Sequence, residues 1–338
     1  MANEMELDRQ HVLARAGSIW EDLAGSNIFI TGGTGFVGSW LLESFVWANE
    51  CFKLNARMSV LTRDPKAFRA KNAELAGSSC LEILSGDLTA FRFPAREFHY
   101  VIHAAAAYEN SEVNVEGLRR VLEMARTHGT RRLLFTSSGA VYGEQPSDLE
   151  KVDEDYTAAG KFGTAYARAK RKSECLCIGA ADSGLAVLIA RLFAFVGPYL
   201  PLDANFAVGN FVRDARMGSP IRIEGDGTPL RSYLYAADLA IWLWTLLTKG
   251  VSLRPYNVGS DQSVSILDLA KIVERTCGAK QGITIGRTAK NGAKVQRYVP
   301  SIVRARTELG LEPWIGLEEG IRRMSNWYGQ RSGQFSMK

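Results

Sequence analysis

Tyr166 and Lys170 are the two residues whose types and spacing most directly suggest chemistry. They stand four apart in a stretch with a helical pattern, so both side chains would face the same side of one helix. A phenol is a poor base at neutral pH, and a neighbouring ammonium lowers the phenol pKa by stabilising the phenolate. Such a pair could pass a proton to or from a hydroxyl group while a hydride moves elsewhere. Because the chain has 11 tyrosines, chance alone could produce this spacing, and its position must decide its meaning.

Hydroxyl side chains stand earlier in the chain, where a β-rich run ends. Residues 135–143 read Phe-Thr-Ser-Ser-Gly-Ala-Val-Tyr-Gly. Hydroxyls at the carboxyl end of a parallel strand lie in the crevice where such sheets bind ligands, so Ser138 could hydrogen-bond the reacting oxygen. The alternative for Ser138 is a serine that caps a turn. Tyr142 is expected to pack beside the site rather than act in it.

A glycine-rich turn lies near the start of the chain, between a β-rich run and a helical pattern. Gly32, Gly35 and Gly38 have the spacing G-x-x-G-x-x-G. The first glycine permits a tight turn, the second lets the backbone approach a pyrophosphate, and the third lets helix and strand pack closely. The pyrophosphate would lie at the N-terminus of the helix, where free N–H groups point at it. A turn without a ligand is the alternative, but the strand–turn–helix context favours a dinucleotide.

The elements that must position these residues alternate between strands and helices. The β-rich runs cover 27–31, 58–62, 81–84, 100–104, 132–136 and 186–193. Helical patterns cover 8–25, 36–47, 113–128, 164–181 and 239–247. This alternation predicts an α/β fold, a Rossmann-type doubly wound parallel sheet with a smaller C-terminal substrate lobe.

The pattern also suggests where the parts of the chain begin and end. Residues 1–26 are expected to form an N-terminal helical extension. Residues 27–196 would form the dinucleotide-binding domain, to which 233–260 return. After Gly197-Pro198 the loops lengthen, so 197–232 and 261–330 are expected to form the substrate-binding lobe.

The composition is that of an ordinary globular protein. Of 338 residues, 41 are Lys or Arg and 36 are Asp or Glu, a net charge of +5 without a basic stripe, so no nucleic acid partner is expected. The five cysteines have no paired C-x-x-C spacing, so no metal site is expected, and free thiols suit a reducing compartment. Residues 1–10 lack the apolar run of a signal peptide, and 239–247 is too short to span a membrane. We therefore expect a cytoplasmic protein with no membrane partner.

Further motifs follow the glycine turn in a fixed order. They are Gly86-Asp87-Leu88, His103-Ala104-Ala105-Ala106, Asn114-Val115-Glu116-Gly117, Ser137-Ser138-x-x-Val141-Tyr142-Gly143, Tyr166-x-x-x-Lys170, Arg191, Gly197-Pro198, Gly225-Asp226-Gly227, Arg231-Ser232-Tyr233, Asp238-Leu239-Ala240 and Tyr256-Asn257-Val258-Gly259. Together they resemble the extended short-chain dehydrogenase/reductases, in the branch of sugar-nucleotide epimerases and dehydratases. The resemblance covers residues 27–328, and the joint pattern is far more specific than any single motif.

The resemblance implies roles for individual residues. Ser138, Tyr166 and Lys170 would be catalytic. The cofactor would be bound by Gly32, Thr34, Gly35, Phe36, Val37, Gly38, Thr62, Arg63, Asp87, Leu88, Ala104, Ala105, Ala106, Asn114, Thr136, Tyr166, Lys170 and Phe193. The substrate would be bound by Ser138, Asn205 and Arg231. Arg231 would face the diphosphate, which suits its bidentate guanidinium; a surface ion pair is the alternative.

The chain departs from the family pattern in ways that bear on activity. Gly139 and Ala140 stand where dehydratases of the family carry acidic residues, so no 4,6-dehydratase activity is expected. The stretch 103–114 is shorter than usual, which would open the site. Ala194 stands where many members have a substrate-binding asparagine.

A fourth departure concerns the cofactor. The second β-rich run ends in Thr62-Arg63-Asp64, and members that prefer NAD usually have an acid in place of Thr62. The guanidinium of Arg63 could bind the 2′-phosphate of NADP. Asp64 could instead form an ion pair with Arg63 or turn towards the ribose. We expect NAD(P), with NADP(H) favoured over NAD.

These observations favour an NAD(P)-dependent oxidoreductase or epimerase that acts at C4 of a nucleotide-linked sugar or deoxysugar, with a 4-keto-sugar reductase preferred. The alternatives are an NAD-dependent 4-epimerase and, from another class, an inactive dinucleotide-sensing protein. Such a sensor would be expected to have lost Tyr166 or Lys170, and both are present. The partner would be a nucleotide-diphosphate sugar, and the family often forms homodimers through helices such as 113–128 and 164–181.

Overall fold

A computed structural model describes residues 4–107, 111–157, 163–181, 184–288, 292 and 294–331. At its centre is a seven-stranded sheet in the order β11-β6-β5-β4-β1-β2-β3, in which all neighbours are parallel. The strands are β1 (Asn27–Thr31), β2 (Arg57–Thr62), β3 (Leu81–Ser85), β4 (Tyr100–His103), β5 (Arg132–Ser138), β6 (Ala186–Leu192) and β11 (Pro255–Val258). The predicted fold class, a doubly wound parallel sheet, is confirmed.

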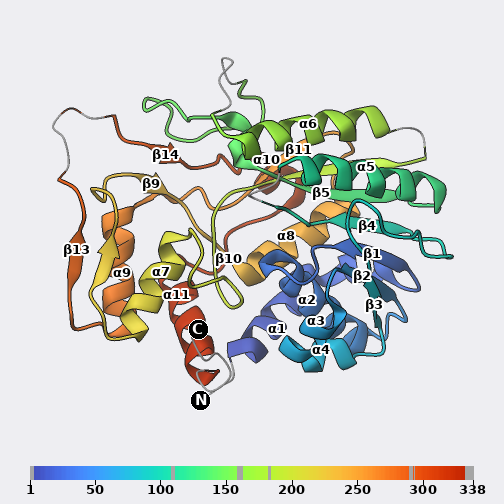
Figure 1. Cartoon of the computed structure of the whole chain (residues 1–338), viewed down its shortest axis with the longest axis horizontal. Coiled ribbons are helices and arrows are strands. Elements are labelled where there is room, and N and C mark those ends of the chain that lie inside the picture. Colours follow the sequence, from blue (N-terminus) through green and yellow to red (C-terminus); the bar gives the residue numbers. More distant parts are fainter. Residues whose placement is uncertain are drawn as a thin grey trace.

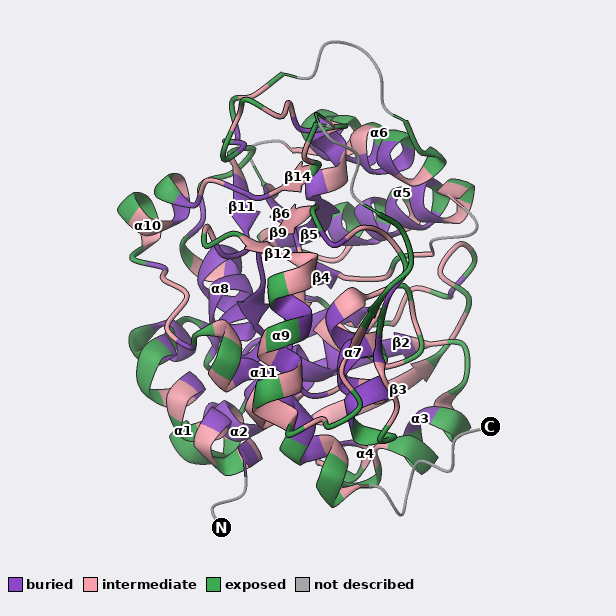
Figure 2. Cartoon of the chain, turned by 90° about the vertical axis from the view of Figure 1, so that its left-hand side faces the viewer, coloured by how far each residue is buried: buried purple, intermediate pink, exposed green. Residues whose placement is uncertain are grey.

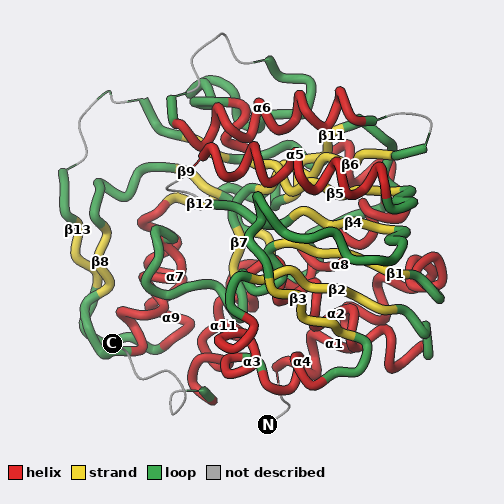
Figure 3. Tube along the Cα trace, turned by 45° about the vertical axis from the view of Figure 1, so that its right-hand side comes forward, coloured by secondary structure: helices red, strands yellow, loops and turns green. Residues whose placement is uncertain are grey.

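Helices cover both faces of this sheet (Figures 1 and 3). One face carries α5 (Ser111–Thr127) and α6 (Ala165–Ala180), and the other carries α2 (Phe36–Phe52) and α8 (Ala236–Lys249). The short helices α3 (Pro65–Lys71) and α4 (Ala73–Gly77) follow β2. Strands covered on both faces need near-continuous apolar runs, and β1, β2 and β4 are accordingly buried along almost their whole length. The chain leaves β1 towards β2 and returns at β4, so the strand order reverses between β1 and β4, where such sheets bind ligands.

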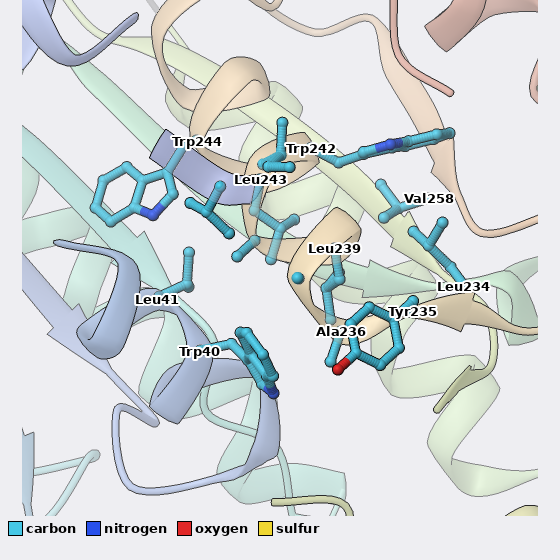
Figure 4. Close-up of a cluster of buried hydrophobic side chains, with 14 of the residues drawn as sticks. Trp40, Leu41, Leu234, Tyr235, Ala236, Leu239, Trp242, Leu243, Trp244 and Val258 are labelled. Carbon is cyan, nitrogen blue, oxygen red and sulfur yellow. The ribbon is translucent and has the colours of Figure 1, made fainter. Parts of the chain in front are cut away.

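The hydrophobic core is centred on α8. Every residue of α8 from Ala236 to Leu247 is buried, and the helix expected over 239–247 is present and longer than expected. Figure 4 shows Trp40 of α2 in one cluster with Tyr235, Leu239 and Trp244. Figure 2 shows α8 almost entirely buried, whereas the outer helices α1, α3 and α4 carry exposed residues.

A smaller lobe faces the carboxyl ends of the central strands. Its helices are α7 (Ala207–Arg216), α9 (Ile266–Cys277), α10 (Val303–Leu309) and α11 (Leu317–Gln330). Its short strands are β7 (Phe195–Val196), β8 (Ile221–Ile223), β9 (Leu230–Arg231), β10 (Leu234–Tyr235), β12 (Val264–Ser265), β13 (Ile283–Ile285) and β14 (Arg297–Tyr298). They pair as β10-β7, β12-β9-β14 and β13-β8, so β9 is the middle strand of its sheet.

The N-terminal segment differs from the single helix expected over 8–25. It forms α1 (Glu4–Ala16) and then a 3₁₀ helix, η1 (Gly17–Leu23), and both pack on α8. Gly17 has a φ of +28°, a value that interrupts the α-helix, so the apolar periodicity continued across a change of helix type.

Buried polar contacts fasten α1 to the rest of the molecule. The fully buried Asp8 carboxylate accepts hydrogen bonds from Tyr235 Oη at 2.7 Å and from Arg323 Nη1 at 2.6 Å. His11 Nε2 lies 2.7 Å from Oδ1 of the buried Asp238. Burial raises the pKa of Asp8 to about 6, which leaves the carboxylate ionised at neutral pH. The extension is therefore tied to α8 and α11 through a buried ion pair.

Replacing Asp8 should destabilise the fold strongly. We expect Asp8→Ala to lower the free energy of unfolding by about 3–5 kcal/mol, because it leaves the guanidinium of Arg323 without its buried partner. Glu318→Ala is the control, since the Arg275–Glu318 pair is exposed and screened by solvent, so its loss should change the stability far less. Denaturant unfolding of both variants at neutral pH would measure the difference. Equal losses would show that Asp8 does not anchor α1.

Candidate active site

One cavity of about 1090 Å³ extends along the carboxyl ends of the central strands and under the smaller lobe. Its wall includes the last residues of β1, β2, β5 and β6, which are Thr31, Thr62, Ser138 and Leu192. Every residue that the sequence assigned to catalysis, cofactor or substrate lines this cavity. The structure thus brings together side chains that are up to about two hundred positions apart in the chain.

The three glycines of the turn differ in what surrounds them. A Cβ on Gly32, where φ is +74°, would lie 2.4 Å from the backbone nitrogen of Ala105, and one on Gly38 would lie 2.1 Å from the carbonyl oxygen of Gly32. A Cβ on Gly35 would meet that same oxygen at 3.5 Å, an ordinary contact. The protein's own packing therefore requires glycine at 32 and 38. At Gly35, the residue before α2, the missing side chain leaves room on the cavity side.

The end of the cavity near β2 is basic. Arg63 is exposed, lines the cavity and has no ion-pair partner among the described residues. Asp64 Oδ1 accepts a hydrogen bond from the backbone N–H of Ala67 at 2.9 Å, so Asp64 caps α3 and does not pair with Arg63. Lys71, in the last turn of α3, lines the same end. Sequence reasoning missed Lys71 because only the course of α3 brings it back to the cavity.

Lys170 is fully buried beside the ring of Tyr166. Its Nζ donates a hydrogen bond to the carbonyl oxygen of Thr136 at 2.7 Å and lies 5.8 Å from the centre of the Tyr166 ring. Burial lowers the pKa of Lys170 to about 8, and Glu174 opposes this shift. The ammonium is therefore mostly charged at neutral pH, and it places a positive charge next to the one phenol on this helix that lines the cavity.

Ser138 ends β5 and begins η2 (Gly139–Tyr142), the turn that follows it. Its Oγ accepts a hydrogen bond from the backbone N–H of Ala140 at 3.2 Å, so the capping alternative is realised. Accepting this bond does not use the hydroxyl proton, which can still be donated to a ligand oxygen. Ser138 also lines the cavity, so the two interpretations are compatible.

A buried polar network fixes α6 against β5 and β6. Ser137 Oγ donates to Glu174 Oε1 at 2.6 Å, and Arg191 binds both oxygens of Glu174 at 3.0 and 2.8 Å. Arg191 Nη1 also donates to Tyr142 Oη at 2.9 Å, and Tyr142 in turn donates to Asn257 Oδ1 at 2.7 Å. Glu174 is one turn after Lys170, so the network sets the position of the Tyr166–Lys170 helix. Tyr142 packs below the site, outside the cavity.

The loop after β4 is held by the side chain of Asn114. Its amide donates to the carbonyl oxygen of Ala107 and accepts from the N–H of Ala107, both at 2.7 Å. Asn114 thus orders residues 104–107 along the cavity. The expectation that the short stretch 103–114 opens the site falls partly on 108–110, which lie outside the described residues.

Arg231 is half-buried in the wall of the cavity, on the middle strand β9, where it is in register with Tyr298 of β14. Its Nη1 donates to the carbonyl oxygen of Leu230 at 2.8 Å, and no carboxylate in the described part of the chain pairs with it. Desolvation lowers the pKa of Arg231, as burial disfavours an uncompensated cation. The alternative of a surface ion pair is not observed. A bidentate cation that faces a cavity without a protein counter-ion suits an anionic ligand.

The wall next to Ser138 is closed by aromatic rings. A Cβ on Gly139 would lie 2.7 Å from Cζ of Phe193 and 2.8 Å from the hydroxyl oxygen of Tyr298. The rings of Phe193 and Tyr298 have their centres 4.7 Å apart. A side chain at position 139 would require the rings of Phe193 and Tyr298 to shift, so the packing of this wall favours the glycine that stands where the dehydratases carry an acid. Tyr298 belongs to no motif, and sequence reasoning did not find it.

Two absences hold for the part of the chain that the structure describes. No group of three or more His, Cys, Asp or Glu side chains there could hold a metal ion. No helix there has the length and hydropathy needed to cross a membrane.

Comparison with known proteins gives a consistent result. Residues 28–259 match the model of the "NAD dependent epimerase/dehydratase family". The chain is 28% identical over 319 residues to UDP-glucuronic acid decarboxylase 2 of Arabidopsis thaliana, covering 91% of this chain and 69% of the relative. It is 26% identical over 317 residues to UDP-N-acetyl-alpha-D-glucosaminuronate decarboxylase of Bacillus cytotoxicus, covering 88% of this chain and 96% of the relative.

Solved structures share the fold at lower sequence identity. An epimerase from Methanothermobacter thermautotrophicus superposes with a TM-score of 0.79 at 23% identity, covering 95% of this chain and 97% of the other. The dTDP-glucose 4,6-dehydratase of Bacillus anthracis, solved in complex with NAD, gives a TM-score of 0.78 at 19% identity, with coverages of 91% and 98%.

Proposed function

Because the chain belongs to the NAD dependent epimerase/dehydratase family, we propose that it is an NAD(P)-dependent enzyme that oxidises or reduces C4 of a nucleotide-linked sugar. The observation that carries the proposal is that one cavity joins the glycine turn, the Tyr166–Lys170 pair with Ser138, and the unpaired cation of Arg231. The glycine turn suits a pyrophosphate, and Arg231 suits a second diphosphate.

The chemistry follows from the groups that meet there. A bound nicotinamide supplies or accepts the hydride. Tyr166 passes the proton to or from the C4 oxygen, and the hydroxyl of Ser138 donates a hydrogen bond to that oxygen. Lys170, held by Thr136, keeps a positive charge beside the phenol and so favours its deprotonated form.

Within this chemistry we prefer a 4-keto-sugar reductase to a 4-epimerase. Both need the same proton and hydride transfers, and they differ in whether the cofactor returns to its starting state in one turnover. The basic end of the cavity supports NADP(H), which cells keep reduced for reductions. A decarboxylase is a second candidate, because both relatives described above carry that name and removal of a carboxyl group can follow oxidation at C4.

Product analysis with the purified protein separates the three reactions. A nucleotide 4-keto-6-deoxyhexose with NADPH should yield the 4-hydroxy product with one equivalent of NADPH consumed. An epimerase would interconvert C4 epimers with no net change in cofactor, and a decarboxylase would release CO₂ from a nucleotide uronate. Formation of a 4-keto-6-deoxy sugar from a nucleotide hexose would contradict the absence of dehydratase activity. If no hydride transfer occurs with any nucleotide sugar, the inactive dinucleotide-sensing protein is the remaining alternative.

Cofactor preference is expected to depend on Arg63. The parent should bind NADP more tightly than NAD, and Arg63→Ala should weaken NADP binding roughly 10- to 100-fold, the range for a lost charged hydrogen bond, while NAD binding stays the same. Titration of both dinucleotides into both proteins measures this. Lys66→Ala is the control, because Lys66 is an exposed cation in the first turn of α3 that does not line the cavity. Tighter binding of NAD by the parent would favour the epimerase.

A homodimer through α5 and α6 is part of the proposal. The exposed charged side chains of α5 are acidic in its first half, at Glu112 and Glu116, whereas Arg119 at its middle and Arg126 in its last turn are basic and Glu123 is the one exposed acid of the second half. Two copies of α5 that meet antiparallel would place opposite charges side by side, which stabilises pairing. Light scattering of the purified protein should give twice the mass of one chain, and Glu116→Arg should shift the balance towards monomer.

A further inference from the structure

Strand β5 holds α6 at two successive residues. The carbonyl oxygen of Thr136 accepts a hydrogen bond from Lys170 Nζ at 2.7 Å. The hydroxyl of Ser137, the next residue, donates to Glu174 Oε1 at 2.6 Å. Lys170 and Glu174 are four residues apart and therefore lie on the same face of α6. A change at Glu174 thus bears on the position of the ammonium one turn earlier.

The register of the central sheet brings Arg191 to the same carboxylate. Arg191 of β6 is in register with Ser137 of β5, and residues in register on parallel strands point their side chains to the same side of the sheet. Arg191 donates to both oxygens of Glu174, at 3.0 and 2.8 Å, and both side chains are buried. The carboxylate of Glu174 is therefore held from β5 and β6 at once.

Few groups can place a charge near the buried ammonium of Lys170. Burial, with the charge of Lys170 added to it, lowers the pKa of His103 on β4 to about 3, so this imidazole is neutral at neutral pH. Burial raises the pKa of the Cys177 thiol on α6, which is therefore neutral as well. The buried side chains of α5 carry no charge. Among the described residues, Glu174 is the ionised carboxylate that acts on Lys170.

The two cations beside Glu174 differ in whether they can lose their proton. An arginine stays protonated in proteins, whereas a buried lysine can become neutral. Burial already lowers the pKa of Lys170 to about 8, and Glu174 opposes this shift. Loss of the Glu174 charge would therefore be answered at Lys170, which would release its proton at a lower pH, while Arg191 would stay charged.

We propose that Glu174 is a positioning residue for catalysis, which holds Lys170 against Thr136 and keeps its ammonium charged beside Tyr166. Arg191 has the opposite electrostatic effect, because it neutralises part of the charge of the carboxylate. Neither Glu174 nor Arg191 lines the cavity, so both act through Lys170. The inference rests on the proposed function, in which the phenol of Tyr166 transfers the proton.

The pKa of Lys170, measured in the protein without substrate, tests the inference directly. It is read from the carbon NMR resonance of Lys170 Cε in protein labelled at lysine and assigned with Lys170→Met. Glu174→Gln should lower this pKa by at least about one unit, the effect of losing a nearby opposite charge. Arg191→Met should raise it, because the charge of Glu174 is then no longer shared. A merely structural role would not produce opposite shifts from the two sides of one ion pair.

Two further variants guard against misfolding and indirect effects. Glu174→Gln combined with Arg191→Gln leaves neither charge of the pair without its partner, so it should fold even where a single variant does not. It should still lower the pKa of Lys170. Tyr142→Phe is the control, because it removes a hydrogen-bond partner of Arg191 without changing any charge and should leave the pKa of Lys170 unchanged. Melting curves establish that each variant is folded.

The single-turnover rate of hydride transfer should follow the same shifts. Its alkaline fall should begin at lower pH in Glu174→Gln and at higher pH in Arg191→Met. A Lys170 pKa that stays unchanged in the folded Glu174 variants, or that moves in the same direction in both single variants, would overturn the inference and leave the proposed function intact. A pKa shift without a matching shift of the rate profile would overturn it as well. If no nucleotide sugar exchanges hydride with the enzyme, the proposed function fails, and the role of Glu174 in catalysis fails with it.

Discussion

Tyr166→Phe is expected to fold like the parent and to lose turnover by at least about 10²–10⁴-fold, the usual contribution of a general acid–base group. The change removes one oxygen and leaves the ring beside Lys170 in place. Without the phenol, no described side chain in the cavity combines a titratable hydroxyl with a neighbouring ammonium. Single-turnover hydride transfer with bound cofactor and a nucleotide sugar is the measurement, because it isolates the chemical step from product release.

Tyr142→Phe is the matched control for this variant. Tyr142 is the next-to-last residue of the run 135–143 that also holds Ser138, but its hydroxyl is buried between Arg191 and Asn257. Its removal should cost roughly 1–2 kcal/mol of stability and leave most of the rate. A Tyr166→Phe enzyme with a nearly parental rate would contradict the proposed mechanism. A Tyr142→Phe enzyme that loses more of its rate than Tyr166→Phe, at the same fraction of folded protein, would contradict it as well.

The reaction rate of the parent enzyme should depend on pH through the Tyr166–Lys170 pair. The pKa of Lys170 is lowered to about 8, so its charge, and with it the support for the phenolate of Tyr166, is lost as the pH rises above about 8. The folded state releases this proton more easily than the unfolded chain, so between about pH 8 and the ordinary lysine pKa the contribution of Lys170 to stability rises with pH. We therefore expect an alkaline fall in rate without a parallel loss of stability from this residue.

Gly35→Asp is expected to leave the fold intact and to weaken dinucleotide binding by more than about 100-fold. Gly35 has a φ of −86° and precedes the first residue of α2, and a Cβ there meets only the oxygen of Gly32 at 3.5 Å. Aspartate is a favoured residue at such a helix start, so the melting temperature should not fall. The new carboxylate would stand where the pyrophosphate of the dinucleotide is proposed to lie, and like charges at that distance repel.

Two other glycines make this prediction specific. Gly38→Ala should instead destabilise the protein, because its Cβ would lie 2.1 Å from the carbonyl oxygen of Gly32. Gly77→Asp is the control for added charge, since Gly77 is exposed with nothing within 4 Å of a Cβ. Melting curves and dinucleotide titrations of all three variants distinguish loss of fold from loss of binding. Unchanged dinucleotide affinity in Gly35→Asp would place the dinucleotide elsewhere.

The local features of the fold followed from the sequence because they arise from neighbouring residues. The strand ending at Thr31, the glycine spacing and the four-residue step from Tyr166 to Lys170 all depend on short-range periodicity and backbone conformation, whereas β5 runs to Ser138, two residues beyond the expected 132–136. Parallel strands then align their carboxyl ends at one edge, so the residues at those ends had to gather. That is why the proposed residues at the ends of the central strands line one cavity, whereas Arg231 reaches it from β9, a strand of a separate sheet.

The tertiary structure decided what depends on contacts between distant segments. Only the packing of β14 brings Tyr298 against Gly139 and Phe193, and only the course of α3 returns Lys71 to the cavity. Asp64 had two partners open to it in the sequence, and the start of α3 gave it a third, the N–H of Ala67. The periodicity of the sequence does not indicate such contacts, because each joins residues whose separation in the chain is set by the fold alone. The sequence thus determined which candidate groups are present, and the tertiary structure determined which side chains surround them in the cavity.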